Sequence, residues 1–382
     1  MTEFYMFIPR EHLENLKKMV EPNKVVSIFG SRRVGKTTLI KEYLRNVREK
    51  VLFVTGDDID VQKSLSSQSA VKLKNFLGDA RFLVIDEAQM IPNIGINLKL
   101  IVDSIEGTKI ITAGSSSFDL NKKIGEPLTG RKKTLTLFPL AQIELGKIEQ
   151  GSETAANLES RLVYGSYPQV VIAEGNDKKR EILNEIISSF LIKDILELEN
   201  IRNSKKVRQL LELLAWQAGS EVSVTELGNK LDLSKNTVEK YLDLLEQVFV
   251  ILNIRGFSRN LRKEVTKTSK YYFYDNGIRN GLLNSFNTLG LRDDIGRIWE
   301  NYIIAERLKK QEYKRIFSNN YFWRTYDRKE IDWIEEREGK LFGYEIKWSN
   351  KKKAVAPRDW IEAYNNAEFN VINKENYLDF IC

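Results

Sequence analysis

The sequence is poor in the residues that build disulfides, zinc sites and thiol nucleophiles. It contains one cysteine, Cys382, and one histidine, His12. These counts exclude an internal disulfide, a Cys/His zinc site and a Cys–His nucleophile pair. Any chemistry must therefore rest on carboxylates, lysines, hydroxyl groups and bound Mg²⁺.

Long apolar runs are absent as well. No uninterrupted run approaches the roughly 20 residues of a membrane-spanning helix. The first residues, MTEFYMFIPREHLENLKK, lack the basic segment and apolar core that mark a secretion signal. We therefore expect a cytoplasmic protein with no membrane partner.

Length and charge set the broad frame. A chain of 382 residues is long for one core, which predicts two or three domains. The net charge of +7 is compatible with DNA or RNA as a partner, but a modest positive excess is weak evidence for one.

The chain is organised around residues 25–38, VVSIFGSRRVGKTT. An apolar run, expected to be a strand, ends in the pattern G-x-x-x-x-G-K-T from Gly30 through Gly35, Lys36 and Thr37. The glycines let backbone N–H groups turn toward phosphate oxygens, and the helix expected next places its positive N-terminus there. We expect Lys36 to reach the β and γ phosphates and the Thr37 hydroxyl to ligate Mg²⁺, while a chance glycine-rich turn is the alternative. The residues expected to bind ATP are Gly30, Arg33, Gly35, Lys36, Thr37 and Thr38.

A second signal is FLVIDEAQ, residues 82–89. Asp86 and Glu87 follow an apolar strand, at the end where ligands bind in open α/β sheets. The pattern of a Walker B strand predicts that Asp86 holds Mg²⁺ and that Glu87 deprotonates an attacking water. A helix N-cap pair is the alternative.

Two further segments are candidates for sensing the γ-phosphate. KIITAGSSS, residues 109–117, predicts a buried strand whose Ser115 or Ser116 contacts this phosphate. Arg131 follows in PLTGRKK, and a fixed guanidinium suits a transition-state phosphate. Arg131 would act in its own subunit or in a neighbouring subunit of a homo-oligomer, and a solvated loop arginine is the alternative.

Residues 201–280 read as three helices and two strands. SVTELGNKLDL and SKNTVEKYLDLLEQ, joined by a tight LDLS turn, predict a helix-turn-helix, and VFVILNIRGF and KYYFYD add the strands of a winged helix. The basic stretch from Arg255 to Arg279, which includes Lys270, would suit a phosphate backbone. DNA contact, protein docking and a structural lid all remain open. The candidate nucleic-acid contacts are Lys235, Asn236, Lys240, Arg259, Arg262 and Lys263.

The C-terminal segment carries a constellation of acids and a lysine. Glu345 and Lys347 lie two apart in GYEIKW and therefore project on one face of a strand. Asp332 lies on the preceding strand, and Glu300 lies on a helix before it. This order gives the PD-(D/E)xK arrangement, in which carboxylates hold Mg²⁺ and the lysine positions a water against a phosphodiester. A cross-strand salt-bridge network is the alternative.

The motifs together resemble the AAA+ ATPases, in particular a prokaryotic group in which a winged helix and a restriction-endonuclease-like domain follow the P-loop domain. The matching stretches are GSRRVGKTT, FLVIDEAQ, TAGSSS, LTGR and YGSYPQVV. The resemblance implies an α/β P-loop domain with a parallel sheet and a helical lid or connector over residues 1–200, a winged helix over 201–280 and a nuclease-like α/β domain over 281–382. The chain departs from the group in lacking a clear second sensor arginine.

The sequence thus predicts a protein that binds and hydrolyses ATP with Mg²⁺ and couples its nucleotide state to a nucleic-acid-directed C-terminal domain, with nuclease activity left open. The alternative is a nucleotide-controlled switch that recruits a protein partner and has an inactive C-terminal domain.

Overall fold

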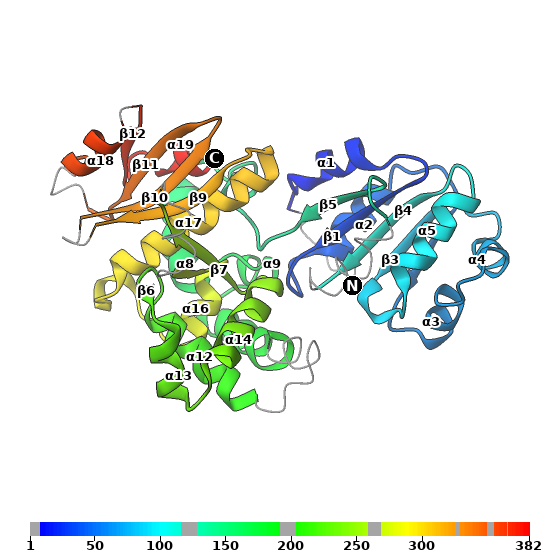
Figure 1. The fold of residues 1–382 in the computed structure, drawn as a ribbon, viewed down its shortest axis with the longest axis horizontal. Helices are drawn as coiled ribbons and strands as arrows, with labels where there is room; N and C mark the ends of the chain where they lie inside the picture. The colour runs from blue at the N-terminus through cyan, green and yellow to red at the C-terminus, as the bar shows by residue number, and fades with distance from the viewer. Residues whose placement is uncertain are drawn as a thin grey trace.

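The computed structural model describes residues 8–115, 128–191, 204–258, 269–325, 329–349, 355–364 and 366–382. The described residues form two sheets, one from the N-terminal third of the chain and one from the C-terminal half. Figure 1 shows the first sheet at the right and the second at the upper left, with helices α12, α13 and α14 below the second.

The first sheet has five parallel strands in the order β2-β3-β4-β1-β5. A mixed α/β structure with a parallel central sheet is therefore confirmed. The strands are β1 (Lys24–Phe29), β2 (Val51–Thr55), β3 (Phe82–Asp86), β4 (Lys109–Gly114) and β5 (Lys132–Thr136). The helices are α1 (His12–Met19), α2 (Lys36–Leu44), α3 (Ile59–Leu65), α4 (Ala70–Leu77), the 3₁₀ turn η1 (Ala88–Met90) and α5 (Ile94–Ser104).

Helices cover both faces of this sheet. Successive strand residues point to opposite sides, so neighbouring residues of one strand pack against different helices. Val26 and Ile28 of β1 join the cluster that contains Leu16 of α1 and Leu39 of α2. Their neighbour Val25 instead joins the cluster built by α4 and α5. This burial on both sides explains why the strands read as continuous apolar runs.

A series of helices links the two sheets. They are α7 (Gln142–Leu145), α8 (Gly151–Tyr164), α9 (Pro168–Val171), α10 (Asn176–Glu185) and the π-helical turn η2 (Ile186–Leu191). Helix α10 continues from Ile186 with π-helical geometry up to Leu191, in the part of the chain where a helical lid or connector is expected.

The helices predicted in the middle segment are present. They are α12 (Ser204–Trp216), α13 (Val224–Leu231) and α14 (Lys235–Gln247). Ser234 caps α14, since its hydroxyl accepts a hydrogen bond from the Thr237 N–H. The winged-helix assignment of this segment stays a prediction.

The second sheet has seven strands in the order β12-β11-β10-β9-β7-β8-β6. The two segments predicted as separate modules on either side of residue 280 share it, because β7 pairs in parallel with β9. Its strands are β6 (Glu221–Val222), β7 (Ile251–Gly256), β8 (Ser269–Phe273), β9 (Asn319–Arg324), β10 (Glu330–Arg337), β11 (Lys340–Ile346) and β12 (Glu368–Ile372). The helices around it are α16 (Asn276–Leu282), η3 (Leu289–Leu291), α17 (Ile295–Lys314), α18 (Arg358–Ala363) and α19 (Tyr377–Ile381).

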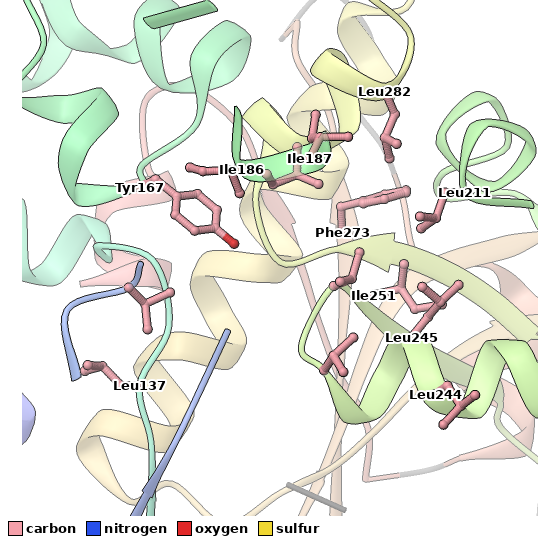
Figure 2. Packing of buried hydrophobic residues seen from close by; sticks show 14 of the residues in the cluster. Leu137, Tyr167, Ile186, Ile187, Leu211, Leu244, Leu245, Ile251, Phe273 and Leu282 are labelled. Carbon is pink, nitrogen blue, oxygen red and sulfur yellow. The ribbon is translucent and has the colours of Figure 1, made fainter. Parts of the chain in front are cut away.

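One hydrophobic cluster runs from the first sheet into the C-terminal half. Figure 2 shows Leu137 and Tyr167 at one end, Ile187 in the middle, and Phe273 and Leu245 at the other end. The two halves are therefore joined by buried apolar contact. Within the described ranges, no helix is long and apolar enough to cross a membrane.

Candidate functional site

The G-x-x-x-x-G-K-T segment forms a loop between β1 and α2, as predicted. Gly30 has φ of 152°, and a Cβ there would lie 2.1 Å from the Leu137 carbonyl oxygen. Gly35 has φ of 97°, a conformation that L side chains rarely adopt. Both positions therefore require glycine, and helix α2 begins directly after the second one, at Lys36.

The buried Lys36 side chain folds back over this loop. Its Nζ donates to the carbonyl oxygens of Gly30 and Ser31 at 2.8 and 3.0 Å. The ammonium group thus lies inside the loop, beside the N-terminus of α2, where an anion is favoured. Thr38, in the first turn of the same helix, is exposed.

Thr37 and Asp86 meet although they are 49 residues apart. The Thr37 hydroxyl donates to Asp86 Oδ2 at 2.6 Å. A hydroxyl and a carboxylate oxygen are ligands of the kind Mg²⁺ takes in P-loop proteins. The two residues predicted to hold the metal therefore fit it in chemistry and in position.

Glu87 follows Asp86 with a left-handed backbone, φ 47°. Its Oε2 accepts a hydrogen bond from Gln89 Nε2 at 2.5 Å, and the same nitrogen lies 3.3 Å from Ser115 Oγ. Gln89 therefore ties the predicted base to the serine predicted as a sensor, and Ser116 lies outside the described residues. No motif predicted a role for Gln89, although FLVIDEAQ contains it.

Gly56, for which no motif predicted a role either, supports this backbone turn. Its N–H donates to the Asp86 carbonyl oxygen at 2.7 Å. A Cβ on Gly56 would lie 2.2 Å from the Glu87 carbonyl oxygen, so no larger residue fits without moving Glu87.

Arg33 lies in the loop but reaches the helices that follow the first sheet. Its guanidinium donates to Gln169 Oε1 at 3.1 Å and to Glu185 Oε1 at 2.6 Å. Arg33 therefore joins the loop to α9 and α10, and its contact with nucleotide stays a prediction.

Arg131 requires a correction. It precedes β5, and its carbonyl accepts from the N–H of Val25 at the start of β1. The phosphate-binding loop lies beyond Phe29, about 13 Å further along the strand at 3.3 Å per residue. The Arg131 side chain pairs with Asp103. Arg131 thus lies at the opposite end of the strands from the phosphate-binding loop, too far away to contact the nucleotide of its own chain. Action on a neighbouring subunit stays a prediction.

Arg10, which no motif indicated, contacts the phosphate-binding loop through the Val34 carbonyl group. Its buried guanidinium donates to the carbonyl oxygens of Val34 and Phe138, both at 2.7 Å, and to Glu144 Oε1 at 2.8 Å. It also lies 3.4 Å from the hydroxyl of Tyr313, near the end of α17. Arg10 therefore connects the phosphate-binding loop with the C-terminal half.

The structure gathers the predicted C-terminal residues around β10 and β11. Asp332 lies one residue before the Trp333–Tyr344 pair of the antiparallel hairpin, so it shares a face with Glu345. Asp332 Oδ2 accepts from the Ile346 N–H at 2.8 Å, and Lys347 Nζ lies 2.5 Å from Glu345 Oε1.

Strand β8 adds two residues to this cluster that were not predicted to belong to it. The Tyr272 hydroxyl donates to Glu300 Oε1 at 2.7 Å. Lys270, expected in an exposed basic stretch, is buried, pairs with Glu330 and lies 3.9 Å from Glu300. Arg279 of the same stretch is also buried and pairs with Asp294, so neither cation is available to a phosphate backbone. We call Lys270, Tyr272, Glu300, Asp332, Glu345 and Lys347 the carboxylate–lysine cluster.

Burial and, after it, charge repulsion disfavour the ionised form of the acids in the carboxylate–lysine cluster. Burial and then the Asp332 charge raise the pKa of Glu300 and of Glu345, and burial raises the pKa of Asp332. Nevertheless, no group of three acidic, histidine or cysteine side chains in the described part of the chain is arranged to hold a metal ion. The Mg²⁺ site that the motif predicts at these carboxylates therefore stays a prediction.

The candidate nucleic-acid contacts divide into two sets. Lys235, Asn236 and Lys240 are exposed on α14, with Lys235 Nζ 3.6 Å from Glu239 Oε1. The other three, Arg259, Arg262 and Lys263, lie outside the described residues.

Comparison with protein families gives three matches along the chain. A family described as "AAA domain" matches residues 22–146. Two families described as domains of unknown function match residues 155–289 and 295–378.

Relatives and solved structures with similarity to the chain were also found. An uncharacterised protein of Mycobacterium tuberculosis is 27% identical over 343 residues, which is 88% of this chain and 73% of that protein. One of Methanocaldococcus jannaschii is 24% identical over 357 residues, 87% of this chain and 78% of that protein. A Walker-type ATPase of Pyrococcus abyssi has 15% identity and a TM-score of 0.49 over 72% of this chain and 96% of that chain. Taken with the geometry, the family matches support an AAA-type P-loop ATPase domain followed by a C-terminal region to which they assign no function.

Proposed function

We propose that this protein is a magnesium-dependent ATPase whose nucleotide state controls its C-terminal half. The observation that carries the proposal is the contact between Thr37 and Asp86, 2.6 Å from oxygen to oxygen. It joins the helix that follows the phosphate-binding loop to the acidic end of β3. A chance glycine-rich turn would not be expected to make this contact.

The residues divide the work of ATP hydrolysis. The amides of the loop and the Lys36 ammonium group bind the phosphates and stabilise the charge of the transferred phosphoryl group. Thr37 and Asp86 would hold Mg²⁺, which supplies charge neutralisation at the β and γ oxygens when bound. Glu87 accepts the proton of the water that attacks the γ-phosphorus, and Gln89 holds the Glu87 carboxylate in place.

Steady-state ATP hydrolysis by the purified chain tests this function. Lys36→Ala should abolish turnover, and Glu87→Gln should lower kcat by about 100-fold or more while ATP still binds. Lys41→Ala, which removes the same charge from the exposed face of α2, is the matched control and should hydrolyse ATP normally. Unchanged turnover in Lys36→Ala would end the proposal.

For the C-terminal half we propose action on nucleic acid. Supporting this are the clustering of Glu300, Asp332, Glu345 and Lys347 in the order that the nuclease-like resemblance implies, and the exposed basic residues of α14. Wild-type protein should cleave DNA or RNA in magnesium buffer, and Asp332→Asn should lose cleavage but keep ATPase activity. Absence of cleavage on a broad panel of substrates would remove the nuclease part.

One observation favours the second candidate, a switch that recruits a protein partner. Lys270 already supplies a cation to Glu330 and Glu300, and no group of three or more acidic, histidine or cysteine side chains among the described residues is arranged to hold a metal ion. An inactive scaffold would show this arrangement. Nucleic-acid binding that weakens steeply with salt favours the first candidate, and salt-insensitive or absent binding favours the second.

A further inference from the structure

Helix α17 touches both candidate sites. Glu300, near its start, belongs to the carboxylate–lysine cluster, and Tyr313, near its end, contacts Arg10 behind the phosphate-binding loop. The two residues are about 20 Å apart along the helix, at 1.5 Å per residue. We infer that ATP binding at the loop is transmitted to the carboxylate–lysine cluster through Arg10, Tyr313 and helix α17. This inference rests on the proposed function, because it requires that the loop binds ATP.

The first step of this route is a single peptide group. Arg10 holds the carbonyl oxygen of Val34, and that carbonyl shares a peptide plane with the N–H of Gly35. In a trans peptide the two groups point in opposite directions. Arg10 therefore fixes the direction of the Gly35 N–H, a donor that the proposed ATP phosphate would need. A rotation of this peptide on ATP binding must also move Arg10.

The second step joins Arg10 to the end of α17. The Tyr313 hydroxyl lies within hydrogen-bond distance of Arg10 and also accepts from the Phe138 N–H at 3.3 Å. Phe138 follows Leu137, whose carbonyl oxygen packs on Gly30. Two separate points of the loop thus reach the same hydroxyl group.

Further contacts hold the end of α17 that carries Tyr313 to elements of the first sheet and its helices. The Asn15 amide donates to the Tyr313 carbonyl oxygen at 3.0 Å, and the Thr136 N–H donates to Glu312 Oε1 at 3.2 Å. Near the middle, Glu306 accepts from the Gln142 N–H at 2.6 Å. The C-terminal part of α17, from Glu306 onward, is therefore attached to α1, to the end of β5 and to α7.

The third step reaches the carboxylate–lysine cluster from α17 by two contacts. Glu300 itself accepts from Tyr272 of β8. Arg307 pairs with both carboxylate oxygens of Glu335 on β10, the strand that also carries Asp332. A shift of α17 along its axis would change the spacing between Glu300 and Asp332, which already repel each other.

The tryptophans allow the route to be tested without any assay of the C-terminal site. All six lie between residues 216 and 360, so residues 1–200 contribute no tryptophan emission. Trp299 of α17 packs against Trp348, with ring centroids 5.3 Å apart, and Trp348 follows Lys347 directly. A change in emission on ATP binding would therefore report from the C-terminal half of the chain.

The experiment titrates the full chain with a non-hydrolysable ATP analogue and Mg²⁺, follows tryptophan emission, and measures binding in parallel by calorimetry. Wild type should show an emission change that saturates with binding. Tyr313→Phe keeps the ring but removes the hydroxyl, so it should bind with Kd within about threefold of wild type and lose most of the emission change. Tyr43→Phe, on α2, is the matched control and should respond as wild type.

The outcomes separate the inference from the function beneath it. Failure of wild type to bind the analogue would overturn the ATPase proposal and the route together. Binding without any emission change, or a full change in Tyr313→Phe, would overturn the route alone. Hydrogen exchange of the α17 amides in the wild-type chain, with and without the analogue, gives a second readout that does not depend on a variant folding, and equal exchange rates would also overturn the route.

Discussion

The hydroxyl of Thr37 and the carboxylate of Asp86 are hydrogen-bonded at 2.6 Å. Thr37 is the second residue of α2, and Asp86 is the last residue of β3, which is separated from β1 in the sheet by β4. The contact therefore depends on the whole parallel sheet being in register, and it brings two oxygen ligands to one point beside Lys36.

A change at Thr37 tests whether this pair serves a metal. Thr37→Val keeps the shape and removes the hydroxyl, so magnesium-dependent hydrolysis should fall by at least about 100-fold, or roughly 2.7 kcal/mol of barrier. Thr37→Ser keeps the hydroxyl and should stay within about tenfold of wild type. Steady-state kinetics across a Mg²⁺ titration measures both. Equal activity of the valine and serine variants would show that the hydroxyl holds no metal.

The close approach of Gly56 to Glu87 gives a second prediction. A methyl group at Gly56 would lie 2.2 Å from the Glu87 carbonyl oxygen, so Gly56→Ala must displace the predicted base. We expect kcat to fall by about 100-fold, because a shift of about 1 Å has that effect on a catalytic group, while the Kd for ATP changes little. Gly151→Ala, where nothing lies within 4 Å, is the control. Normal kcat in a folded Gly56→Ala protein would contradict this role.

The nucleotide site could be predicted because its geometry is local. Adjacent residues in the sequence identify the loop glycines with Lys36 as the start of a helix, and Asp86 as the end of an apolar strand. The structure brings these two segments together. Gln89 and Gly56 were missed because their importance comes from contacts with Glu87 and Ser115 that no spacing encodes.

Lys270 and Arg131 show where a sequence pattern misleads. Lys270 lies among basic residues, which favours an exposed face, yet the pairing of β7 with both β8 and β9 buries it inside the second sheet. Arg131 follows a loop glycine as a phosphate-sensing arginine would. The parallel pairing of β5 with β1 places Arg131 at the end of the strands opposite the phosphate-binding loop. Both errors come from how the strands pair, which the linear sequence does not reveal.

The buried position of Lys270 predicts a large effect on stability. Lys270→Met would leave Glu300 without this cation, while Glu330, which is 30% exposed, would keep Arg324 at 3.9 Å. Breaking a buried pair costs about 3–5 kcal/mol, which is the upper limit of the effect expected here. Lys235→Met is a matched control, because Lys235 also faces a glutamate, but its side chain is 63% exposed against 3% for Lys270. That control should change stability by no more than about 0.5 kcal/mol. Urea unfolding measures both, and equal stability of the two variants would contradict the pairing.

The single histidine, His12, predicts how stability depends on pH. Its Nε2 donates to the Thr136 carbonyl oxygen at 2.8 Å, and its Nδ1 accepts from Asn15 Nδ2 at 3.1 Å, which fixes the neutral form. Burial, as the largest cause, lowers the pKa of His12 from 6.5 to about 4. A proton on Nδ1 would face the Asn15 amide, which is itself a donor, so protonation breaks this contact.

The sign follows from the lowered pKa. Between about pH 6.5 and pH 4 the unfolded chain binds the His12 proton and the folded chain does not, so acid favours unfolding. Stability should therefore fall by about 2 kcal/mol from this group between pH 7.5 and pH 5. Because carboxylates also titrate, the quantity to measure is the difference between wild type and His12→Gln in urea unfolding at both pH values. The variant should lose about 2 kcal/mol less than wild type on acidification. An identical loss in both proteins would show that His12 takes up its proton in the folded state.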